Sequence, residues 1–208
     1  MSAEERSAAA AGAREDRRRA LIGAAFREIA ERGFEGLRTR EVAAAVGLNI
    51  ATLHYYFPTK ETLIQGVVDH AMERFRTTLE PHGSPGDQLR NHLRAVRRLL
   101  RDEPELGAVM AELALRSARD PAIAGIVRET FDAWSRTLRG LLRRAAREGH
   151  LDPALDSDDV AALIVSTLMS LTLPAPSWSA RGDQVIRQLE RWLGLSQAGT
   201  KRPAAPSN

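Results

Sequence analysis

Cysteine is absent from this chain of 208 residues. Its absence excludes disulfide bonds, thiol catalysis and metal sites built on thiolates. The five histidines are scattered without the spacing of a metal site, and the chain contains no HExxH motif, no glycine-rich phosphate loop and no Gly-x-Ser-x-Gly elbow. We therefore expect no metal, no cofactor and no enzymatic activity.

Long apolar runs are also missing. The longest, residues 160–173, is too short to span a membrane and is bounded by Asp158, Asp159 and Pro174. Residues 1–13 are rich in alanine and lack the apolar core of a signal peptide. We therefore expect a cytoplasmic protein without a membrane partner.

Lysine is scarce: it occurs only at Lys60 and Lys201, so 28 of the 30 basic residues are arginine. The 27 acidic residues leave a net charge of +3, which is weak evidence for a nucleic-acid partner. The sequence pI of about 9.9 reflects arginine side chains, which stay charged to very high pH. The positions of the charges are therefore more informative than their sum.

What the chain does contain is helical periodicity, and no segment shows a convincing strand pattern. Caps, prolines and glycines divide it into nine predicted helices, three near the N-terminus and six longer ones. They lie at about residues 14–32, 39–46, 49–56, 59–79, 84–101, 104–118, 120–149, 157–174 and 183–192. The predicted fold is all-α, with an N-terminal three-helix bundle and a six-helix C-terminal domain.

The most specific pattern lies in residues 37–60. Thr39 is placed to cap a short helix, Gly47 supplies a turn where a positive φ is cheap only for glycine, and Asn49 caps the next helix. That helix carries small and polar residues first and then a histidine and two tyrosines at 54–56. A short helix of this kind after a tight turn is typical of one that enters a DNA groove.

Residues at fixed spacing between positions 20 and 66 carry a family resemblance. They are Phe26, Gly33, Phe34, Glu35, Gly36, Leu37, Thr39, Arg40, Glu41, Val42, Ala43, Gly47, Leu48, Asn49, Thr52, Leu53, Tyr56, Phe57, Lys60, Glu61, Thr62 and Leu63. In these positions the chain resembles the tetracycline-repressor (TetR) family of bacterial transcription regulators. The match covers about a quarter of the chain.

The resemblance implies a division into domains. We expect a disordered tail over residues 1–13, a helix-turn-helix DNA-binding domain over 14–60, an effector-binding and dimerisation domain over 61–195, and a disordered tail over 196–208. The fourth predicted helix then belongs to both domains without a linker, so it could transmit movement from one to the other.

The resemblance also implies which residues contact DNA. Those directed at base edges are Arg40, Ile50, Ala51, Thr52 and Tyr55. Those directed at the DNA backbone are Thr39, His54, Tyr56 and Lys60, with Asn49 as the helix cap. The family usually has tyrosine at the position of His54, and histidine has a shorter reach to a phosphate. We expect Phe57 to lie in the core, and a core role is also the alternative for Tyr56. The arginines at 17–19 add positive charge at the start of the first helix, where the alternative to phosphate contact is a solvated helix end.

Two C-terminal helices predict a homodimer. Residues 157–173 are apolar almost all round, which indicates a helix covered on both sides, and residues 183–192 have a similar excess. The candidate interface residues are Val160, Leu163, Ile164, Leu171, Val185, Leu189 and Trp192. The alternative is a monomer with a well-filled core.

The resemblance further implies an effector cavity between the long helices. The candidate apolar walls are Met72, Phe75, Leu79, Val96, Leu100, Val109, Met110, Leu113, Phe131, Trp134, Leu138, Leu168 and Met169. His92 and Arg116 are the candidate polar contacts. Mostly apolar walls favour an apolar or aromatic effector. For each residue the alternative is ordinary core packing.

Together these features predict a ligand-responsive repressor. It would bind palindromic double-stranded operator DNA as a homodimer, associate with the nucleoid when bound, and be released by a small, largely apolar effector. The alternative is a DNA-binding regulator or activator without an effector and without a ligand pocket.

Overall fold

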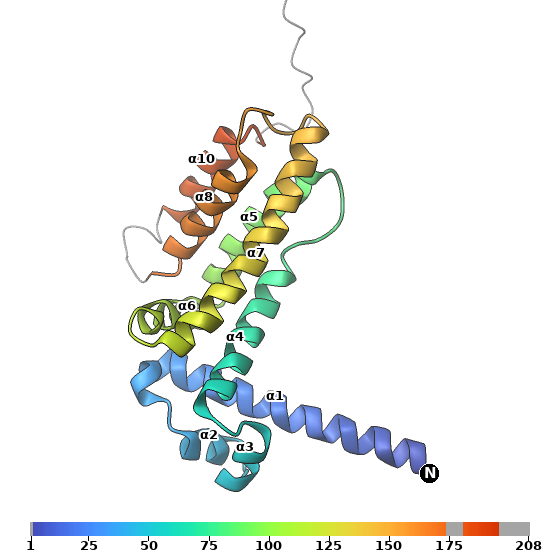
Figure 1. Ribbon diagram of the computed structural model, residues 1–208, viewed down its shortest axis with the longest axis vertical. Helices are drawn as coiled ribbons and strands as arrows, with labels where there is room; N and C mark the ends of the chain where they lie inside the picture. Colours follow the sequence, from blue (N-terminus) through green and yellow to red (C-terminus); the bar gives the residue numbers. More distant parts are fainter. Residues whose placement is uncertain (1, 174–180, 196–208) are drawn as a thin grey trace, which may run out of the picture.

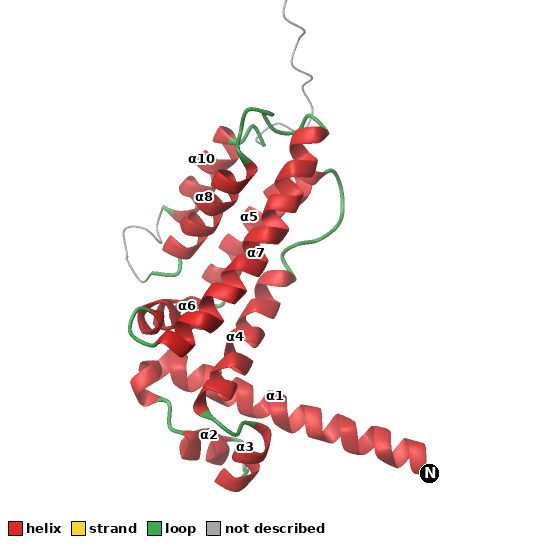
Figure 2. Ribbon diagram, viewed as in Figure 1, coloured by secondary structure: helices red, strands yellow, loops and turns green. Residues whose placement is uncertain are grey.

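The computed structural model describes residues 2–173 and 181–195. Within these ranges the chain forms nine helices and no strand, which confirms the all-α prediction (Figure 2). They are α1 (Ala3–Gly36), α2 (Thr39–Ala45), α3 (Ile50–Tyr56), α4 (Lys60–Arg76), α5 (Pro85–Asp102), α6 (Pro104–Ser117), α7 (Pro121–Arg147), α8 (Ser157–Ser170) and α10 (Gly182–Trp192). The tail predicted at 196–208 lies outside the described residues.

Helix α1 corrects the prediction of a disordered tail over residues 1–13, because it begins at Ala3. Ser2 and Glu5 form a capping box in which the Glu5 amide donates to the Ser2 hydroxyl (3.2 Å) and the Ser2 amide donates to the Glu5 carboxylate (2.6 Å). An alanine-rich segment follows, and alanine has the highest helix propensity. The first turns of α1 extend away from the rest of the molecule (Figure 1).

Gly33 interrupts α1 close to the predicted end of the first helix. Its backbone has φ 68° and ψ −177°, a region that is nearly restricted to glycine. The Phe34 amide is thereby released from the helix and donates instead to the Glu112 carboxylate of α6 (3.1 Å). Gly33 thus lets the end of α1 turn against α6.

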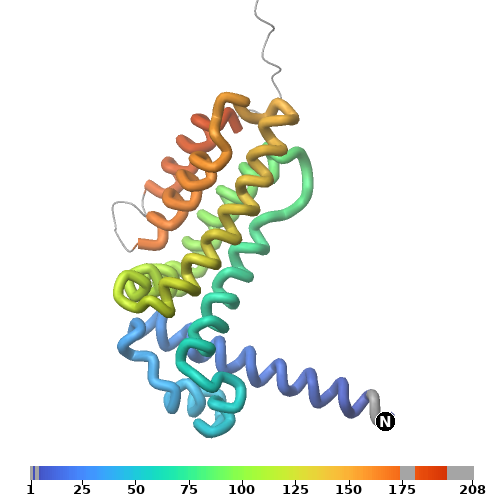
Figure 3. Tube along the Cα trace, in the orientation of Figure 1, coloured from blue at the N-terminus to red at the C-terminus, as the bar shows by residue number. Residues whose placement is uncertain are grey.

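The arrangement places α2 and α3 at one end of the molecule and α8 and α10 at the other. Helix α4 leads from the first end into the body, as its continuous trace shows (Figure 3). Helix α7 runs through the body and packs against α4, α5, α6 and α8, while α1 packs against α2, α4 and α6. A displacement of α4 or α6 would therefore act on α1 through direct packing contacts.

Candidate nucleic-acid interface

The turn between α2 and α3 is built by local bonds. Gly47 has φ 69°, as predicted, and its amide donates to the Ala44 carbonyl (3.0 Å). The Leu48 amide donates to the Ala43 carbonyl (2.9 Å), which closes the end of α2. The Asn49 carboxamide oxygen accepts from the Thr52 amide (2.8 Å), which confirms Asn49 as the cap of α3.

The start of α2 differs from the prediction. Arg38 occupies the N-cap position without a side-chain cap bond, and Thr39 is the first helical residue. The Val42 amide donates to the Arg38 carbonyl (3.0 Å), so the helix starts one residue earlier than a Thr39 cap requires. Thr39 therefore remains a candidate phosphate contact through its hydroxyl and amide in the first turn, not as a cap.

A few buried side chains fix the position of α3. Leu53 of α3 and Val42 and Ala43 of α2 are buried, and Phe57 lies in the core directly after α3. The expected core position of Phe57 is thus confirmed. Tyr56 is only half-buried.

The outward face of α3 is open. Ala51, His54 and Tyr55 are exposed, and Tyr55 is 64% exposed, unusually high for an aromatic residue. The Thr52 hydroxyl donates to the Asn49 side chain (2.9 Å), so its oxygen is left as an acceptor. Ile50 is partly buried. The face offers methyl groups, an imidazole and a phenol to a partner.

Two exposed basic side chains lie on the helices that precede and follow α3 in the chain. Arg40, in the first turn of α2, is exposed, and so is Lys60, the first residue of α4. Lys60 follows the Thr59 cap, whose hydroxyl accepts from the Thr62 amide (3.2 Å). The amides of the first turn of α4 and the ammonium of Lys60 both favour an anion.

The N-terminal part of α1 adds a feature that sequence reasoning missed. The Arg14 guanidinium lies 5.2 Å from the centre of the Tyr55 ring, and Arg18 lies 5.5 Å from that of Phe57. An open concavity of about 560 Å³ separates α1 from α3. It is lined by Ala10, Ala11, Arg14, Glu15, Arg18, Tyr55 and Tyr56. The Ser-x-x-Glu spacing at residues 2–5 was the available signal that α1 reaches this far.

The second candidate site is a cavity between α4 and α7. Its volume is about 110 Å³, and it is lined by Asp69, Met72, Phe75, Arg76, Leu79, Thr130, Ala133, Trp134 and Thr137. Four of the predicted apolar wall residues are among them: Met72, Phe75, Leu79 and Trp134. This space is smaller than the 300–1,000 Å³ or so of typical ligand sites.

His92 does not act as the predicted polar contact of this cavity, because its ring is fully buried and both nitrogens are occupied. The Trp134 indole donates to Nε2 (3.2 Å), which fixes the neutral form with the proton on Nδ1. Nδ1 then donates to the Thr78 hydroxyl (2.7 Å), which donates to the Phe75 carbonyl (2.6 Å). Burial lowers the pKa of His92 to about 4, against the opposing effect of Thr78.

The other predicted pocket residues lie outside that cavity. Val96, Leu100, Val109, Met110, Leu113, Leu138 and Leu168 are buried in the core, and Phe131 and Met169 pack against it. Arg116 binds Glu35 (3.2 Å) and Asp120 (3.4 Å) instead. Apolar periodicity identified the core correctly but did not separate cavity walls from packed residues.

The predicted dimer residues fall into two groups. Val160, Ile164 and Leu189 are buried in the subunit's own core, so they are unavailable to a partner, which corrects their assignment. Leu163 (47% exposed), Val185 (38%) and Trp192 (69%) face outward. Leu171 is partly buried. The phase of each helix about its axis decides which residues are exposed.

The described residues bear on two further kinds of feature, metal sites and membrane-spanning helices. Across residues 2–173 and 181–195, no group of three or more His, Asp or Glu side chains could hold a metal ion. Among the helices that the structure describes, none is both long enough and apolar enough to cross a membrane.

The comparisons with known proteins agree with this geometry. A family model described as bacterial regulatory proteins of the tetR family matches residues 21–67, and one described as the tetracyclin repressor-like C-terminal domain matches residues 79–189. The transcriptional repressor LfrR of Mycolicibacterium smegmatis is 28% identical over 142 residues, which are 66% of this chain and 69% of LfrR.

Solved structures share the fold. A TetR-family regulator from Rhodococcus sp. superposes with a TM-score of 0.76 at 21% identity, covering 86% of this chain and 99% of that one. AibR, solved in complex with isovaleryl coenzyme A and operator DNA, gives 0.66 at 20% identity over 86% of this chain and 98% of AibR. With both family models matched in chain order, this chain belongs to the TetR family of DNA-binding transcriptional regulators.

Proposed function

We propose that this protein is a repressor that binds a palindromic operator as a homodimer and is released by a small, largely apolar effector. The observation that carries the DNA-binding role is the open face of α3, fixed by the Asn49 cap and by buried Leu53. The similarity to LfrR, a repressor, supports the direction of regulation.

The contacts divide by chemistry. Lys60, His54 and Tyr56 can hold phosphates, together with Thr39 and the amides at the start of α4. The arginine at position 40 can pair with guanine, and the methyl groups of residues 50 and 51 can contact thymine. Thr52 and Tyr55 each offer one oxygen to a base edge.

Two substitutions test the DNA interface. In fluorescence anisotropy, the probe is a duplex that the wild-type protein selects from a random library. Lys60→Ala and Arg40→Ala should each weaken binding about tenfold, because each removes one charge-assisted contact. Lys60→Ala should also flatten the salt dependence. Wild-type affinity in both variants would contradict the interface.

Arg128→Ala provides the matched control, because Arg128 is exposed on α7. It removes one positive charge outside the proposed contacts and should retain wild-type affinity. An equal loss in this variant would mean that net charge, and not the proposed contacts, sets the affinity.

The dimer is proposed to form through the exposed apolar residues Leu163, Val185 and Trp192. A two-fold pair could place two copies of α3 in successive major grooves, roughly 34–36 Å apart. Light scattering after gel filtration should give about twice 22.8 kDa. The double variant Leu163→Glu and Val185→Glu should be monomeric, whereas Leu115→Glu, at a site 66% exposed on α6, should stay dimeric. A monomeric wild type would contradict the dimer.

Effector release is proposed to act through α4. The cavity beside Met72 and Trp134 is lined in part by this helix, and the first turn of the same helix carries Lys60 of the proposed DNA interface. An effector that binds one tilt of α4 better than another shifts the population towards that tilt. Its binding requires the cavity to enlarge by movement of side chains such as Met72, which adapts easily to irregular spaces.

The second candidate is a regulator that works without an effector. The cavity volume of about 110 Å³ favours it, because a filled core leaves no room for a ligand. A screen of metabolites for release of the selected duplex distinguishes the two. A compound that releases the wild type but not Met72→Trp supports the effector; the absence of any releasing compound supports the alternative.

A further inference from the structure

Helix α5 presents a stripe of arginines to α10. Arg94, Arg97, Arg98 and Arg101 follow the i, i+3, i+4, i+7 spacing that places residues on one face of a helix. With residues of α10 they line an open concavity of about 280 Å³. Its lining is Arg94, Arg97, Arg98, Arg101, Asp183, Ile186, Arg187 and Glu190. Five arginines thus face two carboxylates.

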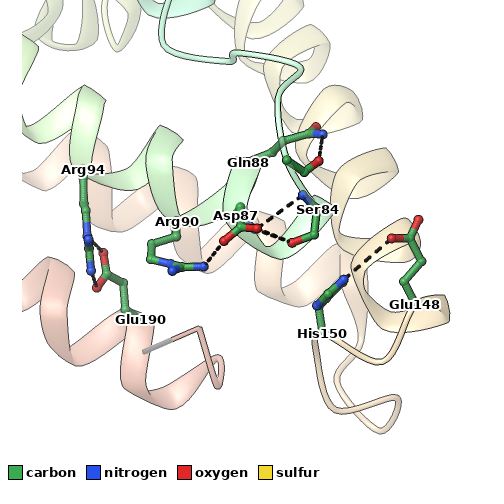
Figure 4. A network of polar contacts seen from close by, with 9 residues as sticks. Ser84, Asp87, Gln88, Arg90, Arg94, Glu148, His150 and Glu190 are labelled. Atoms are coloured by element: carbon green, nitrogen blue, oxygen red, sulfur yellow. Dashed lines mark hydrogen bonds and ion pairs between the residues drawn. The ribbon is translucent and has the colours of Figure 1, made fainter. Parts of the chain in front are cut away.

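Two of these arginines bind the two carboxylates and hold the helices together. The Arg94 guanidinium donates to both oxygens of the buried Glu190 carboxylate (2.6 and 2.7 Å), as Figure 4 shows. This bond raises the pKa of Arg94 above its ordinary value. Arg97 donates to Asp183 (3.0 Å). A Cβ at Gly182 would lie 2.5 Å from the Arg97 Nε, so the glycine makes room for this guanidinium.

The remaining arginines leave a surplus of positive charge. In the part of the chain that the structure describes, neither Arg98 nor Arg187 forms an ion pair or a hydrogen bond. Arg101 binds only its exposed neighbour Asp102 (3.0 Å). Arg98 and Arg187 are therefore available, and Arg101 competes only with an exposed neighbour, at a concavity whose shape is fixed by the pairs on Arg94 and Arg97.

Neither proposed partner of this regulator occupies the groove. The DNA-contacting helices α2 and α3 lie at the opposite end of the molecule. Val185, of the proposed dimer surface, and Arg187 lie two positions apart on α10, so they point about 160° apart around its axis. The groove is also separate from the cavity between α4 and α7, with which it shares no residue.

We propose that this groove binds the phosphate groups of a small phosphorylated molecule, as a second ligand site beyond the DNA and effector sites. Guanidinium groups form planar, paired hydrogen bonds with phosphate oxygens, and Arg98, Arg101 and Arg187 supply them from two helices. The volume of about 280 Å³ lies close to the lower end of the range of ligand sites, roughly 300 Å³. Binding would bridge α5 and α10 and stabilise their contact.

Isothermal titration calorimetry on the full chain tests the site, with inorganic pyrophosphate and ATP as probes at constant ionic strength. The double variant Arg98→Gln and Arg187→Gln should bind pyrophosphate at least about tenfold more weakly than the wild type. Arg119→Gln with Arg128→Gln is the matched control. These arginines are also exposed, and the double change removes the same two charges outside the groove. The control should bind as the wild type does.

The two probes separate the sources of phosphate. Equal affinity for pyrophosphate and ATP would show that the groove recognises phosphate alone. Tighter binding of ATP would show that the groove also contacts the organic portion of the ligand. Absence of binding by the wild type, or equal losses in the two double variants, would overturn the site. A glutamate-rich peptide that binds more tightly than pyrophosphate would also overturn it, in favour of an acidic protein partner.

Discussion

The proposed DNA-contacting end (α1–α3) and the body of this molecule (α4–α8 and α10) are both helical, but different interactions hold them. Helices α2 and α3 have seven residues each and bury only Val42, Ala43 and Leu53, whereas α4 alone buries eight residues. Caps and the turn at Gly47 therefore position α3, and its side chains remain available to DNA. In the body, most apolar side chains are used for packing, and Leu163, Val185 and Trp192 are among the exposed exceptions.

The two regions also use polar groups differently. The Asn49 and Thr52 side chains act at the surface, where water competes with them, while His92 and Trp134 form their hydrogen bond inside the core. A polar group buried in the core costs more to disturb than one at the surface. Substitutions in the body should therefore change stability most, and substitutions on α3 should change DNA affinity most.

The largest effect is expected for Trp134→Ala. It removes a buried indole and leaves the His92 Nε2 without its donor, so the free energy of unfolding should fall by about 3–5 kcal/mol. Urea unfolding followed by circular dichroism measures it. Tyr55→Ala, at an exposed aromatic of α3, should change stability by less than about 0.5 kcal/mol while weakening operator binding. Similar losses of stability in both variants would contradict the claim that the body contributes more to stability than the exposed face of α3.

The next effect is the pH dependence that His92 confers. The unfolded chain takes up a proton near the ordinary pKa of 6.5, but native His92 takes it up only near 4. Above pH 6.5, His92 therefore does not lower the free energy of unfolding. As the pH falls from about 6.5 to 4, protonation of the unfolded chain lowers that free energy by at most about 3 kcal/mol. Urea unfolding at several pH values should show a flatter dependence in His92→Gln. His82→Gln, at an exposed histidine, should keep the wild-type slope.

Gly33→Ala addresses the junction between the two regions. The backbone at Gly33 excludes most side chains, and a Cβ there would lie 3.0 Å from Glu112 Oε2. The free energy of unfolding should therefore decrease by about 1–3 kcal/mol. Gly140→Ala, in α7 with open space around it, should be neutral or stabilising by up to about 1 kcal/mol. A loss in Gly140→Ala and none in Gly33→Ala would contradict the backbone argument.

The smallest stability effect is expected for Asn49→Ala, which removes the cap of α3 at a cost of about 1 kcal/mol. Hydrogen exchange should show faster opening of α3 while the body keeps its protection. Asn91→Ala, at an exposed position within α5, is the control and should leave exchange in α3 unchanged. Faster exchange throughout the molecule would mean that the cap stabilises more than its own helix.

The structure of the DNA-contacting end could be predicted from the sequence because its turn and caps depend on local interactions. Gly47 and Asn49 act within three or four residues of themselves, so their spacing alone predicted the turn and the cap of α3. The same reasoning misplaced the cap at Thr39, because Arg38 starts α2 without a side-chain bond that a pattern could reveal.

The side-chain contacts of the body could be predicted less well, because they join residues that are distant in the sequence. His92 meets Thr78 and Trp134, which are 14 and 42 positions away, and no local pattern reports that both ring nitrogens are occupied. Helix α8 is apolar on most of its surface, so composition indicated that it is covered without showing that Ile164 faces its own subunit and Leu163 faces outward.

The hydrogen bond between the Phe34 amide and Glu112 makes hydrogen exchange of this amide a measure of contact between α1 and α6. Because Gly33 takes this amide out of the helical ladder, its partner is supplied by α6 across the junction. Its exchange with deuterium therefore measures how often the DNA-contacting end separates from α6, without any label. A ligand that loosens this junction would accelerate exchange at one amide before any operator is present.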